Sequence, residues 1–247
     1  MSVVVGTGLE GPAFFLDRQA TRALARGAQA SFAAARPYPH AVFDGFLGEP
    51  LSRALAGAFP GPEHPGWLRR DYREQSGRLG QLQRTAFEGV APSLRHLLAE
   101  LSGMVFLDFL ATLTGIGGLI ADPHFRGAGL SLTLPGGHLS LHADFNRDRG
   151  RHLARALTVL YYLGDDWAAE WGGALELWDE RRTRCEASYL PLRDRLIVMA
   201  HGDTYWHGHP APLACPQGRF RAAVGAYYYV AVPTPADEEA HGAIWAE

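Results

Sequence analysis

The sequence predicts a mainly β fold, a sandwich or a jelly roll, packed with α-helices that come first in the chain. Two patterns in the sequence support this prediction. Residues 1–120 are mainly helix-forming in composition, with leucines at helical spacing. From about residue 124, short apolar or alternating runs are separated by Gly, Pro and Asp, as in strands joined by turns. Because no linker composition separates the parts, we expect one domain over 1–247, with its β core at 121–235.

The first part of the chain predicts several helices. Residues 14–35, rich in Ala, Leu, Arg and Gln, predict a helix that ends at a Pro-rich turn. A short extended run follows at 40–46, and a second helix at about 49–58. Leucines at helical spacing over 92–115 predict one or two further helices, with a break near Gly103. These helices are expected to form a layer against the β core.

A long polar segment lies between the predicted helices. Residues 60–84 are rich in Gly, Pro and Arg, which predicts an irregular loop of the kind that often serves as a lid. Arg69, Arg70 and Arg73 in this loop would suit a substrate carboxylate, although a charged surface loop is the more ordinary interpretation.

The second part of the chain predicts many short strands. Its runs are β-branched and aromatic, as strands prefer. The clearest runs are 138–144, 156–163, 174–178, 195–200 and 221–232.

The composition excludes several classes of function. The formal net charge is −3, so no strong field draws the chain to nucleic acid or to an anionic membrane. All 23 basic residues are arginines, which rules out a Schiff-base lysine and a P-loop lysine. Residues 1–11 lack a basic start, and no window of about 20 apolar residues exists, so we expect a cytoplasmic protein. Cys185 and Cys215 are expected to be reduced thiols, with pairing left open.

One motif is a weak candidate for a nucleotide site. Gly6-Thr-Gly-Leu-Glu-Gly11 matches the glycine pattern of dinucleotide-binding turns. Pro12 follows the last glycine, and no acidic residue lies at about the required distance beyond it. We therefore interpret this motif as an N-terminal segment without a nucleotide.

The strongest pattern is His142-Ala-Asp144, followed much later by His207. Side chains at i and i+2 of a strand point to the same face, so His142 and Asp144 can bind one metal ion together. Two histidines and one carboxylate are the ligand set of non-haem Fe(II) oxygenases. Histidines are also common structural residues, and His209 is an alternative third ligand on the residues alone.

A cation opens the last predicted strand. Arg221 alternates with Ala223, Gly225 and Tyr227, so small residues beside it leave room for a ligand. An arginine in an apolar strand needs an anion, and its fork-shaped guanidinium suits a carboxylate. The alternative is a structural salt bridge with Asp194 or Glu176.

Several segments together resemble the prolyl-hydroxylase-like branch of the 2-oxoglutarate/Fe(II)-dependent dioxygenases. The resemblance covers most of residues 37–232 and recurs in order and spacing. The segments are Pro37–Leu47, Phe106–Leu110, Leu113–Ile116, Leu134–Gly137, His142–Arg147, Leu157–Leu163, Trp171–Trp178, His207–Pro210 and Arg219–Tyr229. One departure is Ala223, where relatives often carry serine, which puts one hydrogen bond to the cosubstrate in doubt.

The resemblance implies a double-stranded β-helix, a jelly-roll core, with flanking helices. It implies Fe(II) on His142, Asp144 and His207, and 2-oxoglutarate and O₂ as cosubstrates, with ascorbate as a supporting reductant. It implies that Arg221 binds the distal carboxylate of 2-oxoglutarate, and that Thr158 and Tyr162 line the cosubstrate pocket.

The resemblance also implies the class of reaction. A hydroxylation of an unactivated C–H bond is expected, with release of succinate and CO₂, and Asp144 favours it over halogenation. Desaturation and cyclisation stay open, as do a non-catalytic sensor of the same fold and a metal-dependent cupin hydrolase or isomerase. The expected substrate is an amino acid, a peptide or a related small metabolite, with Asn146, Arg147 and Arg126 as candidate contacts. The oligomeric state is not specified.

Overall fold

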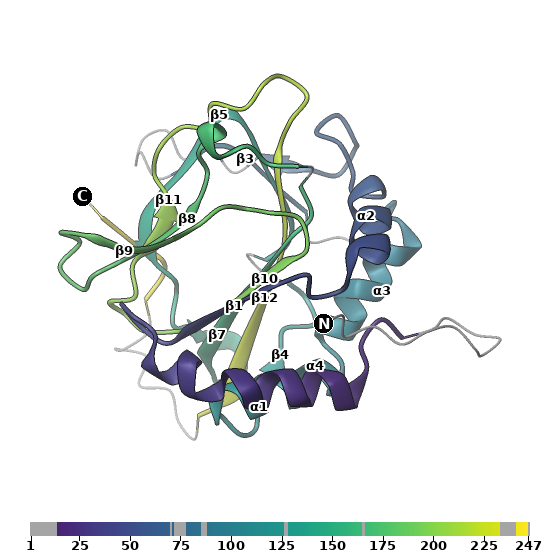
Figure 1. The fold of residues 1–247 in the computed structure, drawn as a ribbon. Helices are drawn as coiled ribbons and strands as arrows, with labels where there is room; N and C mark the ends of the chain where they lie inside the picture. Colours follow the sequence, from purple (N-terminus) through teal and green to yellow (C-terminus); the bar gives the residue numbers. More distant parts are fainter. Residues whose placement is uncertain are drawn as a thin grey trace.

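A curled antiparallel sheet forms the centre of the molecule, and helices cover one of its faces (Figure 1). The computed structural model describes residues 14–69, 71, 78–84, 88–125, 128–164, 166–232 and 241–246. The glycine motif of residues 6–11, together with Arg70, Arg73 and Arg126, lies outside the described residues.

In the part of the chain that the structure describes, four α-helices precede the main strands. They are α1 (Arg18–Ala34), α2 (Glu49–Gly57), α3 (Pro92–Leu101) and α4 (Met104–Thr114). Asp17 caps α1, because its carboxylate accepts a hydrogen bond from the backbone N–H of Ala20 at 2.6 Å. The predicted break near Gly103 is present between α3 and α4. Among the described residues no single helix is long and apolar enough to cross a membrane, although α3 and α4 together, bent by 44°, meet that test by length and composition.

The strands follow the order β1-β10-β7-β12-β5-β11-β8-β9, with β3 and β13 paired to β5. The strands before the core are β1 (His40–Asp44), β2 (Leu68–Arg69), β3 (Arg78–Arg84) and β4 (Ile120–Ala121). The core strands are β5 (Gly129–Ala143), β6 (Arg147–Asp148), β7 (Leu153–Tyr162), β8 (Leu175–Trp178), β9 (Cys185–Tyr189), β10 (Arg195–Ala200), β11 (His207–His209), β12 (Arg221–Ala231) and β13 (Ile244–Trp245). This curled sheet is the double-stranded β-helix that the family resemblance implied.

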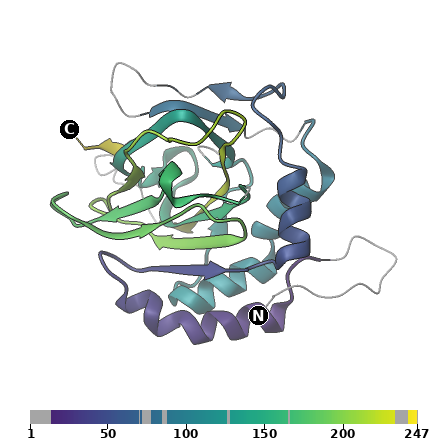
Figure 2. The ribbon, with the colours of Figure 1, turned by 45° about the horizontal axis from the view of Figure 1, so that its top comes forward.

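The alternation of side chains along β7, β10 and β12 separates two cores. Tyr161, Val198 and Val224 belong to the cluster that packs against the helices. Their neighbours Tyr162 and Ile197 point to the opposite face, into the roll. Figure 2 shows the helices gathered along one side of the sheet, with the roll on the other. The interior face of β7 and β12 is therefore the wall against which a site can be built.

Two sequence predictions about strands were wrong in extent. Within the segment predicted as irregular, β3 is a strand that pairs with β5, because Leu82 joins a small core with Leu132 and Ala222 while Gln81 and Gln83 alternate with it. The strand predicted at 138–144 begins much earlier, at Gly129, so Pro135 does not interrupt it. The two cysteines are free thiols.

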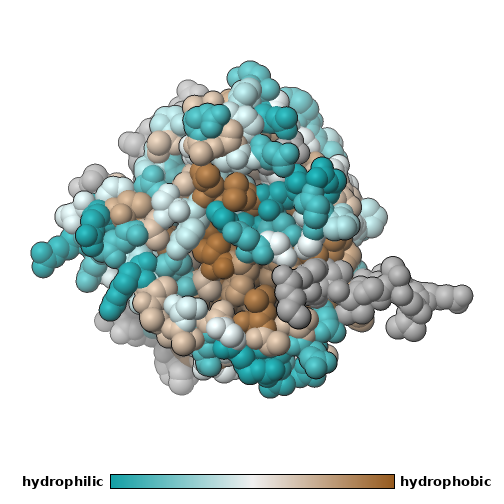
Figure 3. Space-filling model, viewed as in Figure 1, coloured by the Kyte–Doolittle hydropathy of each residue, from teal (hydrophilic) through white to brown (hydrophobic). Residues whose placement is uncertain are grey.

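On the face seen in Figure 3, hydrophilic residues dominate the rim and hydrophobic residues gather near the middle.

Candidate metal centre

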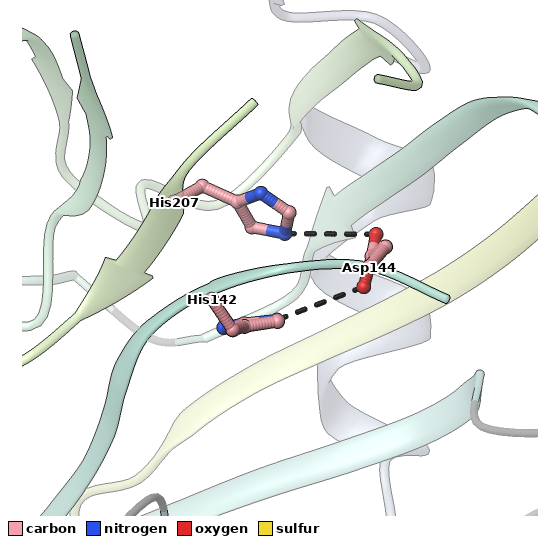
Figure 4. Close-up of side chains that lie close together, drawn as sticks. All are labelled: His142, Asp144 and His207. Atoms are coloured by element: carbon pink, nitrogen blue, oxygen red, sulfur yellow. Dashed lines mark ion pairs between the residues drawn. The ribbon is translucent and has the colours of Figure 1, made fainter. Parts of the chain in front are cut away.

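His142, Asp144 and His207 converge inside the roll, although two different strands supply the histidines (Figure 4). Their ligand atoms all lie within 4.8 Å of one another. His142 Nε2 lies 3.6 Å from Asp144 Oδ1, and His207 Nε2 lies 3.6 Å from Asp144 Oδ2. Three donors so close together and so deeply buried form a set that fits one small cation.

Sheet register explains why these residues meet. β11 runs antiparallel to β5 with His207 directly opposite His142, so the two rings lie 4.5 Å apart between centroids. His209 pairs with Leu139 across a register shift, and it is not part of the metal-holding group. The structure therefore brings His207 rather than His209 to the other two candidate ligands.

Backbone carbonyls orient both imidazole rings. The Nδ1 of His142 lies 2.9 Å from the carbonyl oxygen of Ser140, and the Nδ1 of His207 lies 3.1 Å from that of Tyr205. Each Nδ1 must carry the proton to donate to a carbonyl, so each Nε2 presents its lone pair to the centre. Burial, the largest cause, lowers the pKa of His207 to about 4, so its ring is neutral and ready to bind a metal at neutral pH.

A buried arginine holds the carboxylate. Arg155 NH2 lies 2.9 Å from Asp144 Oδ2, and the Thr158 hydroxyl donates to the same oxygen at 2.9 Å. Burial alone would raise the pKa of Asp144, but Arg155, His207 and His142 together outweigh it and hold that pKa well below its usual range. Asp144 is therefore ionised, and Oδ1 remains available to a cation.

Sequence reasoning missed Arg155. Its side chain is fully buried, and its guanidinium carbon lies 3.3 Å from the ring centroid of Tyr227. The signal was present, because Arg155 interrupts the apolar strand β7 just as Arg221 opens β12. The argument that a buried cation needs an anion would have found it.

The second cation of the site is Arg221, at another part of the same interior face. Its Nε donates to the carbonyl of Gly173 at 2.8 Å, and NH2 donates to the hydroxyl of Tyr162 at 2.8 Å. Asp194 and Glu176 were the alternative partners, but neither forms an ion pair with Arg221 in the described part of the chain. Arg221 is 7% exposed as a residue, and because its guanidinium meets no carboxylate among the described residues, it is suited to an anionic ligand.

One cavity of about 120 Å³ joins the two charged groups. The three candidate ligands line it together with Arg221. The remaining lining residues are Gln81, Leu82, Gln83, Ala128, Gly129, Ser131, Leu139, Thr158, Leu160, Leu175, His209, Ala223, Gly225 and Tyr227. Leu139 and His142 both face this cavity, although they are an odd number of residues apart, because the irregularity between β5 and β11 shifts the alternation.

The other predicted site residues differ in their placement. Thr158 lines the cavity, whereas Tyr162 is fully buried behind it and contacts Arg221. Asn146 accepts a hydrogen bond from the backbone N–H of His241 at 3.0 Å. Neither Asn146 nor Arg147 is among the residues described as lining the cavity, so their contact with a substrate stays a prediction.

The strand β13 contacts His142 of the metal-holding group, which sequence reasoning did not foresee. β13 pairs with the end of β5, with Trp245 opposite His142, and the two rings lie 5.0 Å apart between centroids. His241 Nε2 lies 3.0 Å from Asp203 Oδ1, which ties this segment to the turn before His207.

Comparison with known proteins agrees with this geometry. Residues 128–229 match the family described as the 2OG-Fe(II) oxygenase superfamily, and this match spans β5 to β12. No curated protein matches the sequence.

Several solved structures share the fold at low sequence identity. A prolyl hydroxylase from Trichoplax adhaerens, in complex with a hypoxia inducible factor oxygen degradation domain peptide fragment, is 17% identical with a TM-score of 0.60, and the match covers 85% of this chain and 91% of that one. A prolyl-4-hydroxylase from Pseudomonas putida is 18% identical with a TM-score of 0.55, covering 84% and 99%. HygX from Streptomyces hygroscopicus, with nickel and 2-oxoglutarate bound, is 12% identical with a TM-score of 0.52, covering 89% and 96%. At these identities the likeness concerns the fold.

Proposed function

We propose that this chain, whose residues 128–229 match the 2OG-Fe(II) oxygenase superfamily, hydroxylates an unactivated C–H bond of an amino acid, a peptide or a related small metabolite, with release of succinate and CO₂. The observation that carries the proposal is a single cavity that holds both a His-Asp-His group and a buried arginine without a carboxylate partner among the described residues.

The residues fit the metal and the cosubstrate that this family uses. His142, Asp144 and His207 would hold Fe(II), because their three donors converge and both histidines have Nε2 free of a proton. Arg221 would bind the distal carboxylate of 2-oxoglutarate, because its charge is otherwise unmatched. Iron bound there supplies the oxidising chemistry, together with the 2-oxo acid and O₂.

The protein's own contribution is orientation and exclusion of water. Arg155 and Thr158 fix one oxygen of Asp144, so the other keeps a defined direction toward the centre. Tyr162 contacts NH2 of Arg221, and the carbonyl of Gly173 receives Nε, so the guanidinium plane is held before a ligand enters. Trp245 packs on His142 and limits the access of solvent to that ring.

The substrate is proposed by class. The solved prolyl hydroxylases of similar fold include one in complex with a peptide fragment, which supports testing proline-containing peptides first. HygX has been solved with hygromycin B bound, which supports small metabolites as a second set.

The test is product formation by the purified chain with Fe(II) and 2-oxoglutarate under air. We expect succinate and CO₂ in equal amounts, slowly without substrate and faster with the correct one, whose mass should rise by one oxygen atom. The variant His207→Ala serves as the blank. Binding of 2-oxoglutarate without succinate, for every substrate of both sets, would instead indicate a sensor.

A further inference from the structure

His209 is a buried polar residue of the cavity that the proposed function leaves without a role. It is 2% exposed and lines the same cavity as Arg221, two residues after the candidate ligand His207. The register shift between β11 and β5 sets it opposite Leu139 and apart from the metal-holding group. His209 therefore forms part of the cavity wall without being a member of the metal-holding group.

Neighbouring side chains determine which ring nitrogen of His209 carries the proton. The Thr133 hydroxyl donates to Oε1 of Gln81 at 3.1 Å, which sets the orientation of the amide. The amide nitrogen of Gln81 donates to the carbonyl of His138 at 3.1 Å and lies 3.5 Å from Nε2 of His209. Since an amide nitrogen only donates, Nε2 is the acceptor, and the proton of the neutral ring sits on Nδ1.

That Nδ1 is a buried donor with no hydrogen-bond partner among the described residues. Buried polar groups in folded proteins nearly always have a partner, so an exception in a cavity indicates an acceptor supplied by a ligand. Arg221, in the same cavity, is a cation without a carboxylate partner in the described part of the chain. Because both residues line one cavity, an anion with two oxygens is the kind of acceptor that suits the pair.

The next residue on the same face of β12 as Arg221 carries no donor. Ala223 lies two residues after Arg221 on the same face of β12 and lines the cavity with a methyl group. A hydroxyl at this position would point into the same space as Arg221. Because Ala223 has none, a second hydrogen-bond donor to the anion would come from another strand.

We propose that Nδ1–H of His209 donates to the distal carboxylate of 2-oxoglutarate, as a second donor beside Arg221. This inference rests on the proposed function, because it takes 2-oxoglutarate as the ligand. It makes His209 a cosubstrate-binding residue that favours a 2-oxo acid with a second carboxylate.

The test is calorimetric titration of the Mn(II)-loaded chain with 2-oxoglutarate, without air. His209→Leu removes the donor, and we expect binding to weaken by roughly 10- to 100-fold, the range for a hydrogen bond to a charged group. His209→Asn keeps a donor near the position of Nδ1 and should retain most of the affinity. The affinity for Mn(II) should be the same in all three proteins.

A second substitution provides a rescue. Ala223→Ser, added to His209→Leu, places a hydroxyl on the same face as Arg221, and we expect it to recover a large part of the lost affinity. The discrimination between 2-oxoglutarate and 2-oxopentanoate, which has a methyl group in place of the distal carboxylate, should fall in His209→Leu and rise again in the double variant. His124→Leu, an exposed histidine outside the cavity, is the matched control.

The outcomes separate this inference from the proposed function. Wild-type affinity in His209→Leu, or loss of Mn(II) affinity in parallel with 2-oxoglutarate affinity, would overturn the role of His209 alone. If the wild-type chain binds Mn(II) but not 2-oxoglutarate, the proposed function fails, and this inference fails with it.

Discussion

The two ends of the cavity, one at Asp144 and the other at Arg221, differ in whether a buried charge has a partner of opposite charge. At the metal end, Asp144 already meets Arg155 and Thr158, and both histidine rings are held by backbone carbonyls. At the other end, Arg221 has a carbonyl and a hydroxyl but no carboxylate among the described residues. The metal end is thus arranged by the fold, whereas the cation at the arginine end lacks a carboxylate partner among the described residues.

This difference separates two ways of building a site. Donors at the metal end are oriented by partners that remain in place when a cation arrives, so binding requires little rearrangement. The arginine end keeps a buried cation without a carboxylate partner among the described residues, which costs stability, and under the proposed function the binding of 2-oxoglutarate would recover that cost. The strongest test of the comparison removes one group from each end and measures both metal and 2-oxoglutarate binding.

The largest effect is expected at the metal end. His207→Ala removes one of three converging donors, so binding of Fe(II) or Mn(II) and succinate formation should both be lost. Calorimetric titration with Mn(II) measures this directly, with His124→Ala as a surface control. Undiminished Mn(II) affinity in His207→Ala would mean that the ligand set is wrong, and His209→Ala would then be the variant to compare.

Replacing Arg155 tests whether the protein itself, without a metal, balances the charge of Asp144. Arg155→Met leaves Asp144 buried without its cation, and the free energy of unfolding of the metal-free chain should fall by about 3–5 kcal/mol. The depressed pKa of Asp144 contributes stability above its unfolded pKa of about 3.9, and this stability is lost as the pH falls through the folded pKa. The difference between wild type and variant should therefore be largest above pH 5 and shrink toward acid, as urea unfolding at several pH values will show. A difference that grows toward acid would contradict this account.

The metal end was also the end that the sequence predicted best, because its signals are local. His142 and Asp144 share a strand face, and that alternation is readable without knowing the fold. The choice between His207 and His209 was not readable from the residues, since it depends on register across β5 and β11. Only the resemblance to the oxygenases indicated His207, and in the structure it is His207 whose ligand atom lies near those of His142 and Asp144.

Other features of the structure could not be predicted from the sequence, because they depend on contacts between segments that are far apart in the chain. β3 has polar residues on its cavity side, so its strand character comes from pairing with β5 and from Leu82. Trp245 reaches His142 because the chain returns to the edge of β5 after β12. Asn146 was predicted from its position near Asp144, but its side chain holds the returning segment at His241.

At the arginine end, Arg221→Leu should weaken 2-oxoglutarate binding by roughly 100-fold or more, because the carboxylate loses its only cationic partner in the described cavity. Mn(II) affinity should be unchanged, since Arg221 is not part of the metal-holding group. Calorimetric titration of the same protein with each ligand decides between the two ends. Weakened metal binding with normal 2-oxoglutarate binding would reverse the assignment of the ends.

The smallest effect is expected from Tyr162, which orients Arg221 without lining the cavity. Tyr162→Phe removes one hydrogen bond to the guanidinium, and 2-oxoglutarate binding should weaken by roughly 3- to 10-fold, the equivalent of about 0.5–1.5 kcal/mol. Because the ring is retained, the packing of β7 against β10 should hold, and the unfolding midpoint serves as the control. If Tyr162→Phe equals Arg221→Leu in effect, the hydroxyl itself contacts the ligand, and the arginine end then has one more donor than the geometry assigns.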